Sequence, residues 1–321
     1  MPVINSAFRP AWWLPGPHAQ TLWPAMMRRR QPLDVTWQRL ELDDGDFLDL
    51  AWHGPDDAPV VMLLHGLEGS IQSHYATGIM RALADVGLRA CLMHFRGCSG
   101  TPNRRQISYH SGKTDDPQRV AEHIAATTGS VPFGAVGISL GGNVLLKWLG
   151  EMGLDHPLQR AVAVSVPFNL DEAALRLEEG GSRFYKRHLM KSMKASYRRK
   201  FSAMPSPLEV DLDRLDTFYA FDDAITAALH GFTGVDDYYA RCSSRQFIPQ
   251  IKIRTLILHA SDDPFMYPKT APLEQEIPPA VTLELSPHGG HIGFVEGSLP
   301  WRAQYYAEAR IAEWFAAPGD S

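Results

Sequence analysis

The feature that most constrains this chain is a five-residue segment, Gly137-Ile138-Ser139-Leu140-Gly141. It follows an apolar run over 131–136 and precedes a stretch of helical character over 142–149. In that setting, a G-x-S-x-G sequence predicts a sharp turn from a strand into a helix, at which the glycines let the two elements approach closely. The helix N-terminus favours negative charge beside the serine hydroxyl. Ser139 is therefore the candidate nucleophile, and the alternative is a glycine-rich turn with a capping serine.

The composition narrows the class of protein. The chain has 321 residues, which suits one α/β domain with an insertion, and its apolar content of 45% and charged content of 21% are ordinary for a globular protein. A net charge of −5 gives no indication of a nucleic-acid partner. No apolar run in the sequence approaches the ~20 residues of a membrane span. Three cysteines without a C-x-x-C spacing favour a reducing, cytoplasmic setting.

Apolar segments alternate with helix-like segments along most of the chain. The alternating polarity around an acidic turn predicts a β-hairpin over 35–53. Buried strands are expected over 60–64, 90–95, 135–139, 161–166, 255–259 and 281–285, and helices over 73–86, 117–127 and 300–315. This alternation predicts an α/β fold with a mainly parallel central sheet and helices on both faces.

One long segment, 169–250, interrupts the alternation between two predicted core strands. We expect it to form a cap or lid over the C-terminal edge of the sheet. The predicted organisation is a core of 1–168 and 251–321, with an irregular aromatic arm over 1–33, and a cap insertion over 169–250. A basic run over 183–200 within the insertion is expected to face solvent.

A serine nucleophile needs a base, and the base needs a carboxylate that holds it in the correct tautomer. The chain supplies both after the serine, in the order serine, acid, histidine that α/β-hydrolases use. The acid is Asp263 or Asp262 at the end of a predicted strand, and the Asp-Pro step favours Asp263. The base is His291 or His288 in the loop after the last predicted strand, and two preceding glycines favour His291.

Two backbone N–H groups are expected to stabilise the negative oxygen that forms during acyl transfer. One is that of Leu140, which follows the serine, and the other is that of Leu67, in the glycine-containing turn after the first core strand. The histidines are scattered and no H-E-x-x-H pattern occurs, so no metal is expected. The glycine-rich loops lack the spacing of nucleotide-binding motifs, so no cofactor is expected either.

Several short segments form a specific combination that extends over most of the chain: His18-Ala19-Gln20-Thr21, His65-Gly66-Leu67-Glu68-Gly69, Phe95-Arg96-Gly97-Cys98-Ser99-Gly100, Gly137-Ile138-Ser139-Leu140-Gly141-Gly142-Asn143, Phe221-Asp222-Asp223, Asp237-Tyr238-Tyr239, Ser261-Asp262-Asp263-Pro264 and His288-Gly289-Gly290-His291-Ile292-Gly293-Phe294. In these segments the chain resembles the YheT-type α/β-hydrolases. That group is related to the plant embryogenesis-associated hydrolases and the animal α/β-hydrolase-domain lipases. The resemblance implies an α/β-hydrolase fold and a Ser-Asp-His hydrolase acting on carboxylic esters, including lipid-like ones.

The leading functional prediction is thus an esterase that acts on a small-molecule ester through an acyl-enzyme. Thioesters and monoacylglycerols remain alternative substrates. A binding protein that keeps the fold without turnover is the alternative from another class. Phe218 and Phe232 in the insertion are expected to line the acyl site. The sequence leaves the oligomeric state open.

Overall fold

A nine-stranded, mostly parallel sheet forms the centre of the protein in a computed structural model, which describes residues 2–29 and 32–318. The strand order is β1-β9-β8-β7-β6-β4-β5-β3-β2. All neighbours from β1 to β5 pair in parallel, whereas β3 pairs antiparallel with β5 and with β2. The strands are β1 Val3–Asn5, β2 Thr36–Glu41, β3 Phe47–His53, β4 Val60–Leu64, β5 Arg89–Met93, β6 Gly134–Ile138, β7 Arg160–Val164, β8 Arg254–Ala260 and β9 Val281–Ser286. The predicted hairpin and all six predicted core strands are confirmed.

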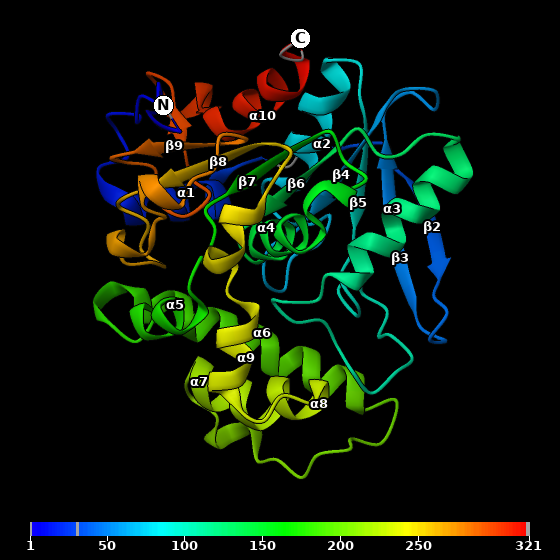
Figure 1. Ribbon diagram of the computed structural model, residues 1–321. Helices are drawn as coiled ribbons and strands as arrows, with labels where there is room; N and C mark the ends of the chain where they lie inside the picture. The colour runs from blue at the N-terminus through cyan, green and yellow to red at the C-terminus, as the bar shows by residue number, and fades with distance from the viewer. Residues whose placement is uncertain (1, 30–31, 319–321) are drawn as a thin grey trace.

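Helices cover both faces of this sheet (Figure 1). On one face, α2 (Ala76–Asp85) packs beside α10 (Tyr306–Ala316). On the other face lie α3 (Asp115–Thr128) and α4 (Leu140–Met152). Alternate residues of a strand point to opposite faces, and β4 shows this: Met62 packs with α3 and α4, whereas Leu63 packs with α2 and α10. The predicted α/β architecture is confirmed.

The prediction of an irregular N-terminal arm is wrong. Within the described part of 1–33, β1 adds a parallel strand beside β9, and Gly16–Met27 forms helix α1. The helix tolerates Pro17 because a proline in the first turn removes an N–H that would have no intrahelical acceptor. The aromatic packing expected here is present, since the rings of Trp13 and Trp23 meet edge to face at 4.7 Å.

The last helix begins later than predicted. Residues 304–305 form a short strand, β11 (Gln304–Tyr305), which pairs antiparallel with β10 (Val295–Glu296). Helix α10 therefore starts at Tyr306 rather than at residue 300. The paired residues of β10 lie eight and ten positions upstream, so the helical periodicity of the segment could not reveal them.

The segment between β7 and β8 folds as helices that lie below the sheet in Figure 1, on the side away from α10. They are α5 Leu170–Arg176, α6 Arg183–Phe201, α7 Phe218–Phe221, α8 Ala228–His230 and α9 Val235–Cys242, with a π-helix over Asp222–Ala227. Their apolar side chains form a cluster of their own. The extent of the cap, 169–250, stays a prediction.

The basic run does not face solvent throughout. It forms α6, whose other side buries Tyr185, Met190 and Met193. Its last lysine, Lys200, is also buried, and its Nζ donates to Oδ1 of Asn103 at 2.5 Å. The side chain of Asn103 accepts a hydrogen bond from the buried ammonium group of Lys200 and so stabilises it. The position of Lys200 in the sequence does not indicate this partner.

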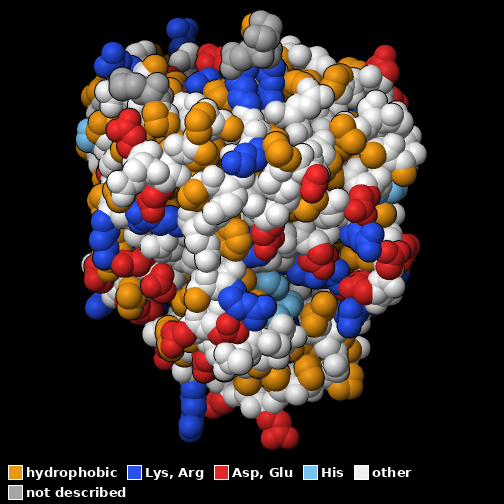
Figure 2. All heavy atoms as spheres, in the orientation of Figure 1, with side chains coloured by type: hydrophobic (Ala, Val, Ile, Leu, Met, Phe, Trp, Pro, Cys, Tyr) orange, Lys and Arg blue, Asp and Glu red, His pale blue; other side chains and the backbone are white. Residues whose placement is uncertain are grey.

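The surface carries acidic and basic side chains interspersed over the face seen in Figure 2, in keeping with a net charge of −5. Across the part of the chain that the structure describes, we find no helix of sufficient length and apolarity to span a lipid bilayer.

A buried arginine ties the hairpin to the rest of the core. Arg96 follows β5 and donates to Asp116 on α3 at 2.6 Å, and to Asp44 and Asp46 in the hairpin turn at 2.6 and 3.1 Å. Asp46 and Asp116 are almost fully buried. Burial raises the pKa of Asp116, against the opposing effect of the Arg96 charge. Arg96 is the cation that all three carboxylates share, although Asp44 also pairs with Arg105 at 3.1 Å and Lys113 lies 3.9 Å from Asp116.

We predict that Arg96→Leu lowers the free energy of unfolding by about 3–5 kcal/mol, because it leaves buried carboxylates without a counter-charge. Arg198→Leu is the matched control, since Arg198 pairs with Asp213 at the surface. That change should cost at most about 1 kcal/mol. Urea unfolding measures both, and equal costs would contradict the role given to Arg96.

Candidate active site

Ser139 sits on a strained turn between β6 and α4. Its backbone adopts φ 52° and ψ −118°, a conformation that side chains rarely take. Glycines make the turn possible, because a Cβ on Gly137 would lie 2.5 Å from the carbonyl oxygen of Gly141, and one on Gly141 would collide with the carbonyl oxygen of Leu64. The Ser139 N–H donates to Val164 of the neighbouring strand β7 at 2.9 Å. The predicted elbow is therefore present.

A continuous hydrogen-bond chain runs from Ser139 to a carboxylate. The Ser139 hydroxyl lies 3.0 Å from Nε2 of His291, and Nδ1 of the same ring lies 2.8 Å from Oδ2 of Asp263. The carboxylate as acceptor assigns the proton to Nδ1, which leaves Nε2 free to accept from the serine. Both His291 and Asp263 are buried, so water does not compete for these contacts.

The structure separates the two candidate acids and the two candidate bases. Asp262 accepts from the Gly290 N–H at 3.0 Å and lies 3.3 Å from Nδ1 of His288. The His288 side chain is largely exposed. Asp262 thus braces the loop that precedes His291, whereas Asp263 contacts the imidazole that reaches the serine.

An aromatic ring packs against the face of the His291 imidazole, a contact that the sequence did not indicate. The ring of Phe265 stacks on that of His291 with centroids 3.9 Å apart and planes 5° from parallel. The Asp263 Oδ1 accepts from the Phe265 N–H at 2.8 Å, so one carboxylate orients both rings. Phe265 lies only two residues after the acid, yet the stacking depends on how the two loops meet.

Helix α1 clamps the loop that carries His291. Thr21 Oγ1 accepts from the His291 N–H at 2.9 Å, and the Gln20 side chain forms two hydrogen bonds with the backbone of Val295. The helix lies so close that a Cβ on Gly290 would be 2.5 Å from the Pro17 carbonyl oxygen. The N-terminal segment is therefore part of the site, although the sequence suggested only an aromatic arm.

The turn after β4 presents Leu67 toward the serine. Gly66 donates its N–H to the Tyr75 hydroxyl at 2.8 Å, and Glu68 donates its N–H to the Tyr109 hydroxyl at 2.8 Å. Within the described residues, neither the Leu67 N–H nor the Leu140 N–H has an acceptor. Two free donors thus remain near Ser139, as an oxyanion hole requires.

A buried histidine and a buried asparagine fix this arrangement, and neither was singled out from the sequence. Burial lowers the pKa of His65 to about 3, so its neutral ring donates to the Gly66 carbonyl and accepts from the Phe95 N–H. Asn143, one turn after Ser139, donates to the carbonyls of Ser111 and Cys242, both at 2.8 Å. The nucleophile helix is thereby joined to the end of the helical insertion.

A cavity of about 480 Å³ opens beside Ser139 and His291. Its wall combines the two predicted oxyanion residues with apolar side chains of the insertion, among them Leu170, Leu177, Leu189 and Phe218. Phe218 therefore lines the cavity beside Ser139. Phe232 is not, because it packs against His110 and Tyr238 away from this wall. A helical insertion turns only some of its aromatic residues toward the cavity, and composition does not say which.

Comparison with known proteins agrees with this geometry. Residues 59–298 match the family model described as alpha/beta hydrolase fold. YheT of Escherichia coli (strain K12) is 43% identical over 92% of this chain and 89% of its own length. The chain belongs to the YheT-type α/β-hydrolases. The predicted resemblance is confirmed, and with it the hydrolase class.

More distant proteins are also similar to this α/β-hydrolase. Phospholipase ABHD3 of Mus musculus is 27% identical, over 95% of this chain and 77% of its own length. The esterase Pf2001 of Pyrococcus furiosus superimposes with a TM-score of 0.56 at 14% identity, covering 98% of this chain and 97% of the esterase. At that identity the superposition concerns the fold alone.

Four histidines, of which three are buried and His230 is half-buried, make the stability of this hydrolase depend on pH. Burial lowers the pKa of His65 to about 3 and those of His156, His230 and His259 to about 4. An unfolded histidine has a pKa of about 6.5. Between these values the unfolded chain binds more protons than the folded one, so stability is complete above about pH 6.5 and is lost as the pH falls toward about 4.

We therefore predict that the urea midpoint falls as the pH is lowered from 7 to 5. His156→Gln removes one of these groups and should reduce the pH dependence while leaving its sign unchanged. A midpoint that is constant over this range would contradict the prediction.

Proposed function

We propose that this hydrolase cleaves carboxylic esters with Ser139 as the nucleophile, His291 as the base and Asp263 as the group that orients the base. The observation that carries the proposal is the unbroken chain of contacts from Asp263 through His291 to the Ser139 hydroxyl, at 2.8 and 3.0 Å. A serine is weakly nucleophilic at neutral pH, and this contact chain is the arrangement that activates it.

In the proposed reaction, His291 Nε2 accepts the proton of Ser139 as its Oγ attacks the ester carbon. The N–H groups of Leu67 and Leu140 then stabilise the negative oxygen of the tetrahedral intermediate. Asp263 stabilises the imidazolium that has formed. His291 returns the proton to the leaving alcohol, and the acyl-enzyme remains. Water, activated by the same imidazole, releases the acid and restores Ser139.

The cavity supports an ester with substantial apolar parts, because the insertion contributes mainly apolar side chains to its wall. The names of relatives point the same way, since they include a phospholipase and a monoacylglycerol lipase. A thioester or a monoacylglycerol is therefore an alternative substrate at the same site. The second alternative, a binding protein without turnover, is disfavoured because it has no physical need for the strained Ser139 turn and the aligned His291.

Two further predictions accompany the proposal. The helices of the insertion supply much of the cavity wall, which supports a cap over 169–250. The three cysteines are unpaired, which suits the proposed cytoplasmic location.

Ser139→Ala should lower kcat by at least ~10³-fold and abolish covalent labelling by a fluorophosphonate. The folded structure should persist, since the change removes one oxygen from a partly exposed site. Labelling with a fluorophosphonate, followed by intact-mass measurement, tests the nucleophile directly. Near-normal ester hydrolysis by the alanine variant would contradict the proposal.

Asp263→Asn should lower kcat by about 10⁴-fold, because an amide favours the wrong tautomer of His291. Asp262→Asn is the matched control, as it changes the neighbouring carboxylate, which contacts His288 and Gly290 instead. Its loss should be far smaller. Steady-state kinetics on one activated ester compares the two, and a larger loss in the Asp262 variant would exchange the two roles.

A further inference from the structure

A second, smaller cavity adjoins the one that contains Ser139. Its volume is about 150 Å³. The two cavities share a wall that includes Leu67, Leu140, Phe218 and Asp222. The two predicted oxyanion residues therefore stand at the junction between the cavities.

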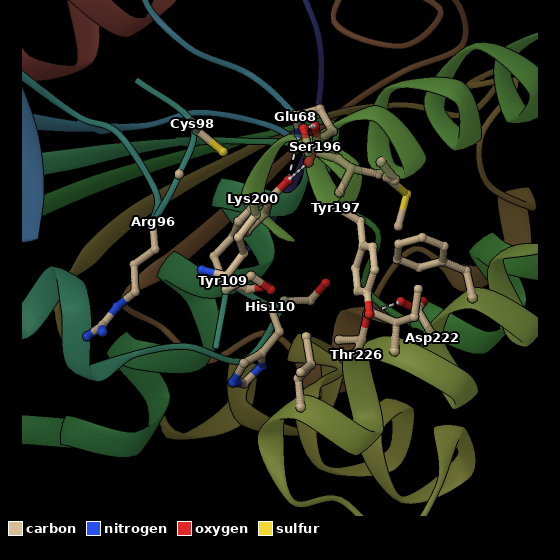
Figure 3. Close-up of a pocket in the computed structure, with 18 of the residues that line it drawn as sticks. Glu68, Arg96, Cys98, Tyr109, His110, Ser196, Tyr197, Lys200, Asp222 and Thr226 are labelled. Carbon is tan, nitrogen blue, oxygen red and sulfur yellow. Dashed lines mark hydrogen bonds between the residues drawn. The ribbon is translucent and has the colours of Figure 1, made fainter. Parts of the chain in front are cut away.

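Both carboxylates around the small cavity accept hydrogen bonds from neighbouring hydroxyl groups (Figure 3). Glu68 accepts from the hydroxyls of Tyr109 and Ser196, and Asp222 accepts from Thr226 at 2.6 Å and from Tyr239 at 2.8 Å.

Three cations line its edge, and each of them has acceptors of its own. Arg96 points away from the other labelled side chains in Figure 3, and it donates to Asp44, Asp46 and Asp116. Lys200 donates to Asn103 and to the Arg105 carbonyl, and Arg199 donates to the Gly97 carbonyl and to Ser196. The remaining lining is mostly apolar and includes Met193, Phe201, Phe218, Phe221, Ile225 and Leu229. Such a lining fits an uncharged, apolar group.

The position of His291 gives the two cavities different roles. His291 and Ser139 line the large cavity and not the small one. The leaving oxygen must lie next to His291, because it takes the proton from Nε2 as its bond to the acyl carbon breaks. The acyl substituent projects from the other side of that carbon. It therefore points away from His291, past Leu67 and Leu140.

We propose that the small cavity is the acyl chamber of this enzyme and that the large cavity holds the alcohol part of the ester. This assignment rests on the proposed function. It makes the preferred substrate an ester of a short, uncharged acid with a larger apolar alcohol.

The volume sets a limit on the acyl group. An apolar cavity of about 150 Å³ binds a benzene-sized molecule, which corresponds to an acyl tail of about six carbon atoms. The large cavity, at about 480 Å³, has three times the space for the alcohol. Turnover should therefore fall once the acyl chain exceeds about six carbons.

Two leucines of the insertion provide a matched test. Leu229 on α8 lines only the small cavity, and Leu189 on α6 lines only the large one. Both are half-buried in the same apolar cluster. Leu229→Phe fills the proposed acyl chamber, Leu229→Ala enlarges it, and Leu189→Phe fills the alcohol side.

The experiment measures kcat/KM for two ester series. One series is the 4-nitrophenyl esters of acetic, butanoic, hexanoic and decanoic acids, and the other is acetates of alcohols of increasing size. Leu229→Phe should lower the hexanoate-to-acetate ratio by about tenfold or more, and Leu229→Ala should raise the decanoate-to-hexanoate ratio. Both should leave the alcohol ratios unchanged, whereas Leu189→Phe should alter the alcohol ratios. Because each ratio compares two substrates of the same variant, a smaller fraction of folded protein does not change it.

Each contrary result has its own meaning. If the acyl-chain ratios change in Leu189→Phe and not in the Leu229 variants, the roles of the two cavities are reversed. If these ratios change in none of the variants, the assignment of the two cavities is wrong. Faster turnover of the hexanedioic monoester than of hexanoate overturns the apolar character of the chamber. Ester turnover that persists in Ser139→Ala, or no turnover in the wild type, overturns the proposed function itself. Turnover that depends on Ser139 with unchanged acyl ratios in the Leu229 variants overturns the acyl chamber alone.

Discussion

The strained turn at Ser139 is the constraint on which the rest of the site depends. Its positive φ aims the hydroxyl out of the sheet, and close backbone contacts at Gly137 and Gly141 hold that conformation. Helix α4 then starts at Leu140, so its first N–H groups point to the place where negative charge would develop. Asn143 joins the same helix to the insertion. Ser139, the Leu140 N–H and the adjoining part of the insertion thus share one rigid support.

His291 reaches this turn because two separate segments hold its loop. Helix α1 binds the His291 backbone through Thr21, the loop after β8 supplies Asp263 and Phe265, and Asp262 braces Gly290. Several backbone angles in the site are of a kind that side chains rarely adopt, including those of Glu68, Ser139 and Ile292. A strained backbone conformation persists only where many surrounding contacts hold it in place. The density of contacts around His291 is consistent with that requirement.

Most of the fold followed from local pattern. The hairpin and the six core strands occur where apolar runs and turn residues indicated them, because strands buried on both faces leave a clear signal. The errors have one cause. Helix α1 and the burial of Lys200 depend on partners distant in the sequence, and the short strand β11 depends on a pairing partner outside its own segment. Periodicity within a segment carries no information about such partners.

The sequence by itself determined which reactive side chains are available. They are a serine between glycines, then Asp262 and Asp263, then His288 and His291, in an order that an α/β sheet brings to one edge. Only the tertiary structure shows which member of each pair belongs to the contact chain that reaches Ser139, because this depends on distances of about 3 Å between loops that follow different strands. It also decided that Phe218 lines the cavity and Phe232 does not. Which side chains of the insertion face a cavity depends on how its helices and the loops between them pack, and packing is a property of the whole chain.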